Sequence, residues 1–329
     1  MTDSPVTLVA DDIYQVKIPL PFALNSVNVY LLRGDVGWTI VDTGINTQIA
    51  RDTWQIAFDE LKITPHDIEQ IVLTHVHPDH FGLAGWLQSL AKEAGRDVPI
   101  VLSPREEQAV QEIWLEKLVV DFVGWLTASG MTVAMAEEVS DSMTHTRAMT
   151  RPHPTALTQH KAGQPIRMGN RTFQTIHAPG HSDGQLIFYD EADKLLLSGD
   201  HVLMKITPNI GLWVMSDPNP LGLFLDSLKT VRDLDVRLAL PGHKWLIEDW
   251  QGRIDEIIHH HDLRLNHTLE AIEAGNHIPY DIAEHIFPTE RFTVHEWRFA
   301  VAETFAHLDY LRRRGKITQA DGKRHFSLA

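Results

Sequence analysis

The feature that most constrains this sequence is a block of metal-ligand-type side chains, His75-Val76-His77-Pro78-Asp79-His80. The apolar stretch Ile71-Val72-Leu73-Thr74 before it predicts a short buried strand, so the block lies where the chain leaves a sheet edge. Because alternate residues of an extended chain point the same way, His75 and His77 share one direction. The turn that follows lets Asp79 and His80 face a neighbouring point. Imidazole and carboxylate suit zinc and similar divalent ions, so we predict a metal site at this strand end.

Three further candidate ligands also follow predicted strands. The strands predicted at 171–176, 195–197 and 238–240 are followed by His181, Asp200 and His243, respectively. In α/β sheets, chemistry gathers outside one end of the strands, which predicts that these loops meet. The full set of seven candidate ligands is His75, His77, Asp79, His80, His181, Asp200 and His243.

The order of predicted elements indicates two domains. Strands alternate with helices up to Trp250, which predicts a layered α/β body. Three helices then follow, at about 253–274, 280–287 and 294–314, and 316–328 reads as a hairpin with its turn at Asp321-Gly322. Three helices followed by a hairpin are typical of a winged helix. We therefore predict a catalytic domain over residues 1–252 and a mostly helical, winged-helix-like domain over 253–329.

A helical insertion is predicted within the first domain, at 104–150. One interpretation is an apolar lid over an acyl or aromatic substrate, and the other is an extra packing layer or a homodimer surface. The apolar side chains that suggest a lid are Trp114, Leu118, Phe122, Trp125, Met131 and Met135.

Charge and composition narrow the class of protein. The net charge of −15 argues against a surface built mainly to bind nucleic acid, which relies on Lys and Arg. The chain has no cysteine, so disulfides and thiolate metal ligands are excluded. We find neither a signal peptide in Met1–Leu20 nor a membrane span, and we expect a cytoplasmic protein.

These motifs resemble those of the metallo-β-lactamase superfamily, and within it the hydroxyacylglutathione hydrolase (glyoxalase II)-like branch. The family's H-x-H-x-D-H block, G-H-[ST] histidine, G-D aspartate and P-G-H histidine all have counterparts here, in order, between about Ile13 and Trp250. The region after Trp250 resembles the winged-helix domain of some members, including the β-lactamase-like protein 2 group. The resemblance implies an αββα sandwich with a dinuclear metal site at one edge.

The resemblance also implies a role for each residue. His75, His77 and His181 would hold the first metal, Asp79, His80 and His243 the second, and Asp200 would bridge them. Asp42, in Val41-Asp42-Thr43-Gly44, matches a family position near the site and would orient the metal ligands without binding the metal itself. The alternative is that Asp42 is a plain turn residue. Zinc is the expected metal, and iron or manganese also suits this ligand set.

Two such ions can share one water and lower its pKa from 15.7 toward about 7, so that the bridging hydroxide is a nucleophile at neutral pH. Asp79 would accept or relay the proton. We expect hydrolysis of a small-molecule thioester or other acyl ester. The alternatives are a lactonase, or a phosphodiesterase or ribonuclease, because relatives bearing a winged helix include nucleases. A non-catalytic binding protein is not favoured, since no ligand is missing.

Three other features are interpreted as structural. The basic residues that could contact phosphates are Arg312, Arg313, Arg314, Lys316, Lys323 and Arg324, and cations at a helix end also oppose its dipole favourably. The run His259-His260-His261 cannot converge on one ion, because consecutive helical side chains point about 100° apart. We expect His201, next to the candidate bridge, to pack.

Overall fold

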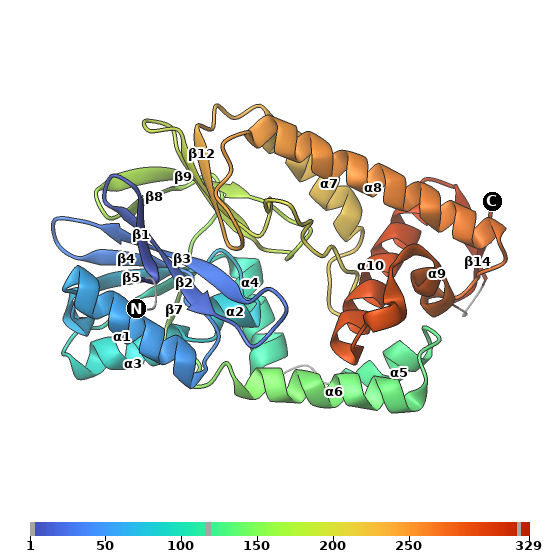
Figure 1. Ribbon diagram of the computed structural model, residues 1–329, viewed down its shortest axis with the longest axis horizontal. Coiled ribbons are helices and arrows are strands. Elements are labelled where there is room, and N and C mark those ends of the chain that lie inside the picture. The colour runs from blue at the N-terminus through green and yellow to red at the C-terminus, as the bar shows by residue number, and fades with distance from the viewer. Residues whose placement is uncertain (1–3, 116–119, 321–323) are drawn as a thin grey trace.

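The computed structural model describes residues 4–115, 120–320 and 324–329. Two large sheets lie together on the left in Figure 1. The first has seven strands in chain order, namely β1 (Val6–Ala10), β2 (Ile13–Pro19), β3 (Ser26–Arg33), β4 (Trp38–Val41), β5 (Ile68–Val72), β6 (Ile100–Leu102) and β7 (Leu157–Gln159). The second has the order β12 (Leu238–Pro241), β11 (Leu195–Gly199), β10 (Leu186–Asp190), β9 (Arg171–His177) and β8 (Pro165–Met168).

Alternating side chains explain why the two sheets stack. In β3, Val29 and Leu31 point to the outer face of the first sheet, whereas Tyr30 and Leu32 join the core between the sheets. β10 divides in the same way, with Phe188 in the inner core and Ile187 on the outer face. Both faces of each sheet are therefore apolar, and each outer face needs a helical cover.

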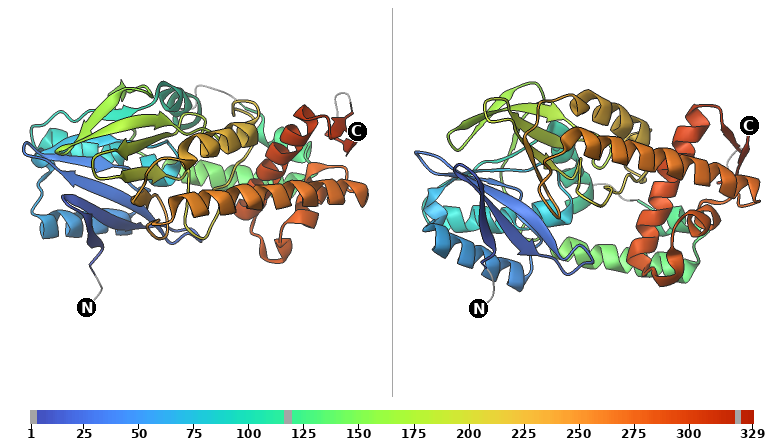
Figure 2. Two further views of the ribbon diagram at one scale, coloured as in Figure 1. Left: turned by 90° about the horizontal axis from the view of Figure 1, so that it is seen from above. Right: turned by 45° about the horizontal axis from the view of Figure 1, so that its top comes forward.

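Helices supply that cover on both sides. α1 (Gln48–Leu61) and α3 (Ala84–Glu93) contribute to the cluster on the outer face of the first sheet, and α7 (Pro220–Arg232) and α8 (Trp250–Glu273) to that on the second. The right-hand view of Figure 2 shows the same four layers. The predicted αββα fold is confirmed.

The strand before the histidine block begins and ends earlier than predicted. β5 covers Ile68–Val72, so Leu73 and Thr74 already belong to the segment that leads into the block. The backbone N–H of Thr74 donates to the Asp42 side chain rather than to a neighbouring strand. Three short strands were not predicted, namely β1, β7 and β8.

The insertion at 104–150 is helical but interrupted. It contains α4 (Pro104–Ala109), the π-helical turn η2 (Val110–Trp114), α5 (Phe122–Thr127) and α6 (Val133–Ala148). Trp114 is buried and donates to the carbonyl of Val76. Met131 is buried in the cluster that includes the C-terminal helices. Leu118 lies outside the described residues.

The C-terminal region is helical, and its elements are α8, α9 (Pro279–Ile286), α10 (Val294–Arg313) and the antiparallel pair β13 (Ile317–Gln319) and β14 (Phe326–Leu328). This agrees with the predicted order of three helices and a hairpin, although the turn predicted at Asp321-Gly322 falls outside the described residues. α6 and α8 both run from the sandwich toward this region (Figure 1). No helix within the described ranges is long and apolar enough to cross a membrane.

Candidate metal centre

The seven candidate ligands meet at one edge of the two sheets. His75 and His77 follow β5, and Asp79 and His80 lie on the short helix α2 (Pro78–Phe81). His181, Asp200 and His243 follow β9, β11 and β12, respectively. The parallel pairing of β11 with β12 brings the last two strand ends together. Convergence therefore follows from the strand topology.

The ligand atoms form two adjoining triads. In the first, His77 Nδ1 lies 3.0 Å from His75 Nε2 and 2.9 Å from His181 Nε2. The second contains Asp79, His80 and His243, and its ligand atoms lie within 4.8 Å of one another. Each triad thus presents three nitrogen or oxygen atoms to one point.

Asp200 lies between the triads. Its Oδ2 atom is 3.5 Å from His181 Nε2, and it is 3.4 Å and 3.3 Å from the Nε2 atoms of His80 and His243. Zinc–nitrogen bonds of about 2.0–2.1 Å place tetrahedral ligands about 3.3 Å apart. The observed spacing is therefore that of ligands around a common cation rather than that of short hydrogen bonds.

The remote nitrogens of the histidines have their own partners. Nδ1 of His181 lies 2.9 Å from the carbonyl of Asn209, and Nδ1 of His243 lies 2.9 Å from the carbonyl of Ser26. Nδ1 of His75 lies 2.9 Å from Thr74 Oγ1. A carbonyl can only accept, so in His181 and His243 Nδ1 carries a proton and Nε2 is the atom that faces the site.

Asp42 provides the corresponding partner for His80. Its Oδ2 lies 2.8 Å from His80 Nδ1 and accepts from Thr74 Oγ1 at 2.8 Å, while its Oδ1 accepts from the backbone of Thr74 at 2.8 Å. The φ angle of Asp42 is 60°, which short polar residues tolerate better than most. The structure therefore places Asp42 where it orients a candidate ligand.

The two triads differ in charge. Burial lowers the pKa of His77 to about 3 and lowers those of His75 and His181, so these imidazoles are neutral at pH 7. Burial also disfavours a charged His243, but Asp200 and Asp79 outweigh it and raise its pKa to about 10. The second triad therefore lies in a surplus of negative charge that attracts cations.

Unpaired buried atoms test whether a metal fits. Among the described residues, His80 Nε2, His243 Nε2 and Asp200 Oδ1 are buried without a hydrogen-bond partner. Such atoms are costly unless something in the site satisfies them. Nitrogen and oxygen donors that converge in this way fit a divalent cation.

The turn that carries His243 approaches Asp200 closely. A Cβ atom at Gly242 would lie 2.2 Å from Asp200 Oδ1 and 2.7 Å from His80 Cε1, so only glycine fits there. β3 holds this turn from the other side, because Tyr30 Oη and Asn28 Nδ2 both donate to the carbonyl of Pro241, at 2.8 and 3.0 Å.

Glu106 is a positioning residue that the sequence analysis missed. Its carboxylate accepts from the backbone N–H groups of Val76 and Gly184, both at 2.9 Å, and from Ser182 Oγ. It thereby joins the loop of His75 and His77 to the loop of His181. The pattern Ser103-x-x-Glu106 indicates a helix cap, and Ser103 does cap α4, so nothing local points to the long-range contacts.

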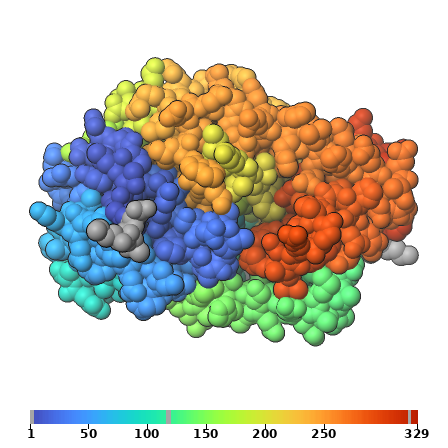
Figure 3. All heavy atoms as spheres, in the orientation of Figure 1, coloured from blue at the N-terminus to red at the C-terminus, as the bar shows by residue number. Residues whose placement is uncertain are grey.

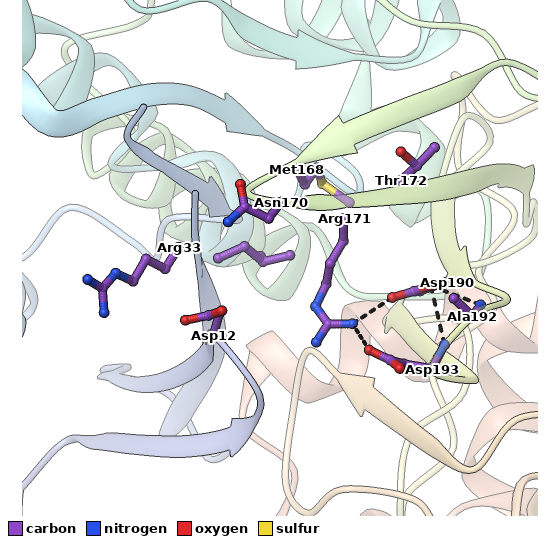
Figure 4. Close-up of a pocket in the computed structure, with 10 residues that line it drawn as sticks. Asp12, Arg33, Met168, Asn170, Arg171, Thr172, Asp190, Ala192 and Asp193 are labelled. Carbon is purple, nitrogen blue, oxygen red and sulfur yellow. Dashed lines mark hydrogen bonds and ion pairs between the residues drawn. The ribbon is translucent and has the colours of Figure 1, made fainter. Parts of the chain in front are cut away.

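The other histidines lie elsewhere. His201 is buried, with Nε2 3.1 Å from Ser227 Oγ, in agreement with the predicted packing role. His261 is buried against His307. A hollow of about 390 Å³ lies among Asp12, Arg33, Asn170, Arg171 and Asp190, where Arg171 pairs with Asp190 (Figure 4). None of the seven candidate ligands lines it.

Comparison with known proteins agrees with this fold. Residues 23–243 match the metallo-beta-lactamase superfamily, and residues 265–327 match a family described as "Metallo-beta-lactamase-like, C-terminal domain". The chain belongs to the metallo-β-lactamase superfamily and is a metal-dependent hydrolase.

Individual relatives extend over nearly the whole chain. The Bacillus subtilis protein named "Probable metallo-hydrolase YqjP" is 24% identical over 94% of this chain and 95% of its own. The metallo-beta-lactamase family protein TTHA1429 from Thermus thermophilus is 31% identical, with a TM-score of 0.86 over 98% of this chain and 100% of its own. A beta-lactamase domain protein from Burkholderia ambifaria is 27% identical, with a TM-score of 0.88 over 100% of this chain and 96% of its own.

Proposed function

We propose that this protein is a dinuclear metal hydrolase that cleaves a thioester or other acyl ester of a small molecule, as in the glyoxalase II-like branch. His75, His77 and His181 would hold one cation, Asp79, His80 and His243 would hold the other, and Asp200 would be shared between them. The observation that carries the proposal is the position of Asp200 Oδ2, within 3.5 Å of ligand nitrogens from both triads.

Each part of the protein has a stated task in this proposal. Two divalent cations, zinc in the first instance, supply Lewis acidity and an activated water at neutral pH. The chain's own residues orient the ligands, through Asp42, the carbonyl of Asn209 and the carbonyl of Ser26. Asp79 has its pKa held low by His80 and His243 despite burial, so it is ionised and able to accept a proton.

An acyl substrate is favoured because aromatic rings lie between the two domains. Phe22 and Trp213 from the sandwich, and Phe299 from α10, are half-buried there. The basic residues that would favour a nucleic acid are largely engaged elsewhere. Arg312 and Arg313 both pair with Asp309, at 2.7 and 2.6 Å. The guanidinium of Arg314 lies over the Tyr310 ring. Arg324 donates to the carbonyl of Trp125 and to Ser129 Oγ.

The test is metal analysis together with a substrate panel. Protein loaded with zinc, iron or manganese is assayed on acyl thioesters, lactones and bis-p-nitrophenyl phosphate. We expect the highest kcat/KM on a thioester or acyl ester, and the Asp200→Ala variant should lose both turnover and part of its metal. Preference for the phosphodiester would overturn the substrate class, and unchanged turnover in Asp200→Ala would overturn the bridging role.

A further inference from the structure

Arg298, on α10, is a buried cation with no counter-charge among the described residues. It is 9% exposed, its Nε atom has no hydrogen-bond partner, and no carboxylate forms an ion pair with it. Burial alone lowers the pKa of Arg298 to about 10, so it remains charged at pH 7. A buried charge is costly unless a partner compensates it.

Other partly buried arginines of the chain have their charge or donors satisfied. Arg171 pairs with Asp190 at 2.8 Å. Arg253 donates to the carbonyls of Leu203 and Ile206, at 2.7 and 2.8 Å. Arg264, on α8, donates to the carbonyl of Ile286. Arg298 is therefore an exception that calls for a partner from outside the described chain.

The position of Arg298 connects it to the metal centre. Residues 295, 298, 299 and 302 lie on one face of α10, because helical positions three, four and seven apart coincide. This face packs on the loop that follows the metal-site strands, since Leu212 donates to the carbonyl of Ala302 and Asn209 Nδ2 contacts Glu303 Oε2 at 2.8 Å. The carbonyl of the same Asn209 holds His181.

His295 lies on the same face of α10 as Arg298. Burial, together with the charge of Arg298, lowers the pKa of His295 to about 4, against the opposing charges of Glu296 and Asp79. Asn209, whose carbonyl lies 2.9 Å from His181 Nδ1, also donates from Nδ2 to the carbonyl of Phe299, the neighbour of Arg298, at 3.3 Å. Arg298 is one helical turn from His295, and residues three apart on a helix are about 5–6 Å apart at Cβ.

A row of aromatic rings includes His295. The ring of Phe22 stacks on His295 at 5.4 Å, His295 meets Phe299 at 5.1 Å, and Phe299 meets Trp213 at 5.9 Å. The Arg298 guanidinium carbon lies 4.5 Å from the centre of the Phe299 ring. Figure 3 shows blue N-terminal atoms meeting orange-red C-terminal atoms near the middle of the molecule.

We infer that Arg298 binds an anionic group of the substrate, such as a carboxylate, that lies away from the bond being cleaved. The aromatic row contacts the apolar part of the same substrate. This inference rests on the proposed acyl hydrolysis. It assigns a substrate class, acyl compounds with a second and negatively charged end, and it gives the C-terminal domain a direct part in substrate selection.

Matched substrates test the inference. Glutaryl and valeryl thioesters of one neutral thiol differ by a carboxylate, and a second pair carries the carboxylate on the thiol instead. Wild-type protein should prefer the anionic member of one pair. The pair that shows this preference identifies whether Arg298 binds the acyl part or the thiol part of the substrate. In Arg298→Met this preference, as a ratio of kcat/KM values, should fall roughly tenfold to hundredfold. The control Arg264→Met removes another partly buried arginine and should keep the ratio.

A thermal readout separates binding from a structural role. Because Arg298 lacks a counter-charge, Arg298→Met without ligand should melt at the same temperature as wild type or higher. Glutarate should bind metal-loaded wild-type protein more tightly than valerate by calorimetry, and Arg298→Met should bind the two equally. A lower melting temperature with an intact preference would overturn the inference. If no acyl compound is hydrolysed, the proposed function fails, and the glutarate comparison still decides the role of Arg298.

Discussion

Replacing Asp42 with asparagine should weaken the second metal site without removing the fold. The backbone is kept, because asparagine tolerates the φ of 60° at this position. The amide retains one oxygen for the Thr74 N–H at 2.8 Å but presents N–H groups to His80 Nδ1. His80 then accepts at Nδ1, so its proton moves to Nε2, the atom that faces the metal site. The ligand nitrogen is thereby blocked by a proton.

Loss of such a partner typically costs about 10–100-fold in metal affinity, which corresponds to about 1.4–2.7 kcal/mol. The assay is metal content by elemental analysis after dialysis against graded chelator. Half-removal from the second site should need about 10–100-fold less free chelator than in wild type. The control is Asp190→Asn, a buried carboxylate that pairs with Arg171 at the far end of β10 and should lower stability alone. An unchanged chelator midpoint in Asp42→Asn would refute this reasoning.

Two further predictions concern carboxylates that support the site. Glu106→Gln should lower the free energy of unfolding by about 1–3 kcal/mol and weaken metal binding at the first triad, since the amide cannot accept from Val76, Ser182 and Gly184 together. Urea unfolding measures the first effect and metal analysis the second. A variant with the stability and the metal content of wild type would contradict the role of Glu106. Burial raises the pKa of Glu303 from 4.5 to about 7, against the opposing effects of Arg264 and Asn209. The folded state thus holds more protons than the unfolded state between these values, so stability falls by about 3 kcal/mol as pH rises from about 4.5 to about 7. Glu303→Gln should remove this contribution, and equal slopes of stability against pH in the two proteins would rule it out.

Much of the site could be predicted because its signals are local. His75, His77, Asp79 and His80 lie within six consecutive positions after an apolar run, and the other candidate ligands follow predicted strands. The strands before His181, Asp200 and His243 end at one edge of the second sheet, and packing of the two sheets brings that edge to the end of β5. The fold class followed from the alternation of strands and helices, which depends on residues close together in the chain.

The supporting partners could not be predicted in the same way. Glu106 bonds to Ser182, 76 residues further along the chain, whereas its local pattern indicates only a helix cap. The partners of His181 and His243 are the backbone carbonyls of Asn209 and Ser26, and a carbonyl is present at every position. No sequence pattern identifies which backbone carbonyl will accept a hydrogen bond from a ligand histidine.

The sequence by itself determined the ligand types, their spacing within each loop and the apolar faces that stack the sheets. Only the tertiary structure decided which face of α10 meets the sandwich, and therefore that Arg298 is buried without a counter-charge beside Phe299 among the residues described. The physical reason is that local spacing governs periodicity and turns, whereas burial and charge pairing depend on which distant segments pack together.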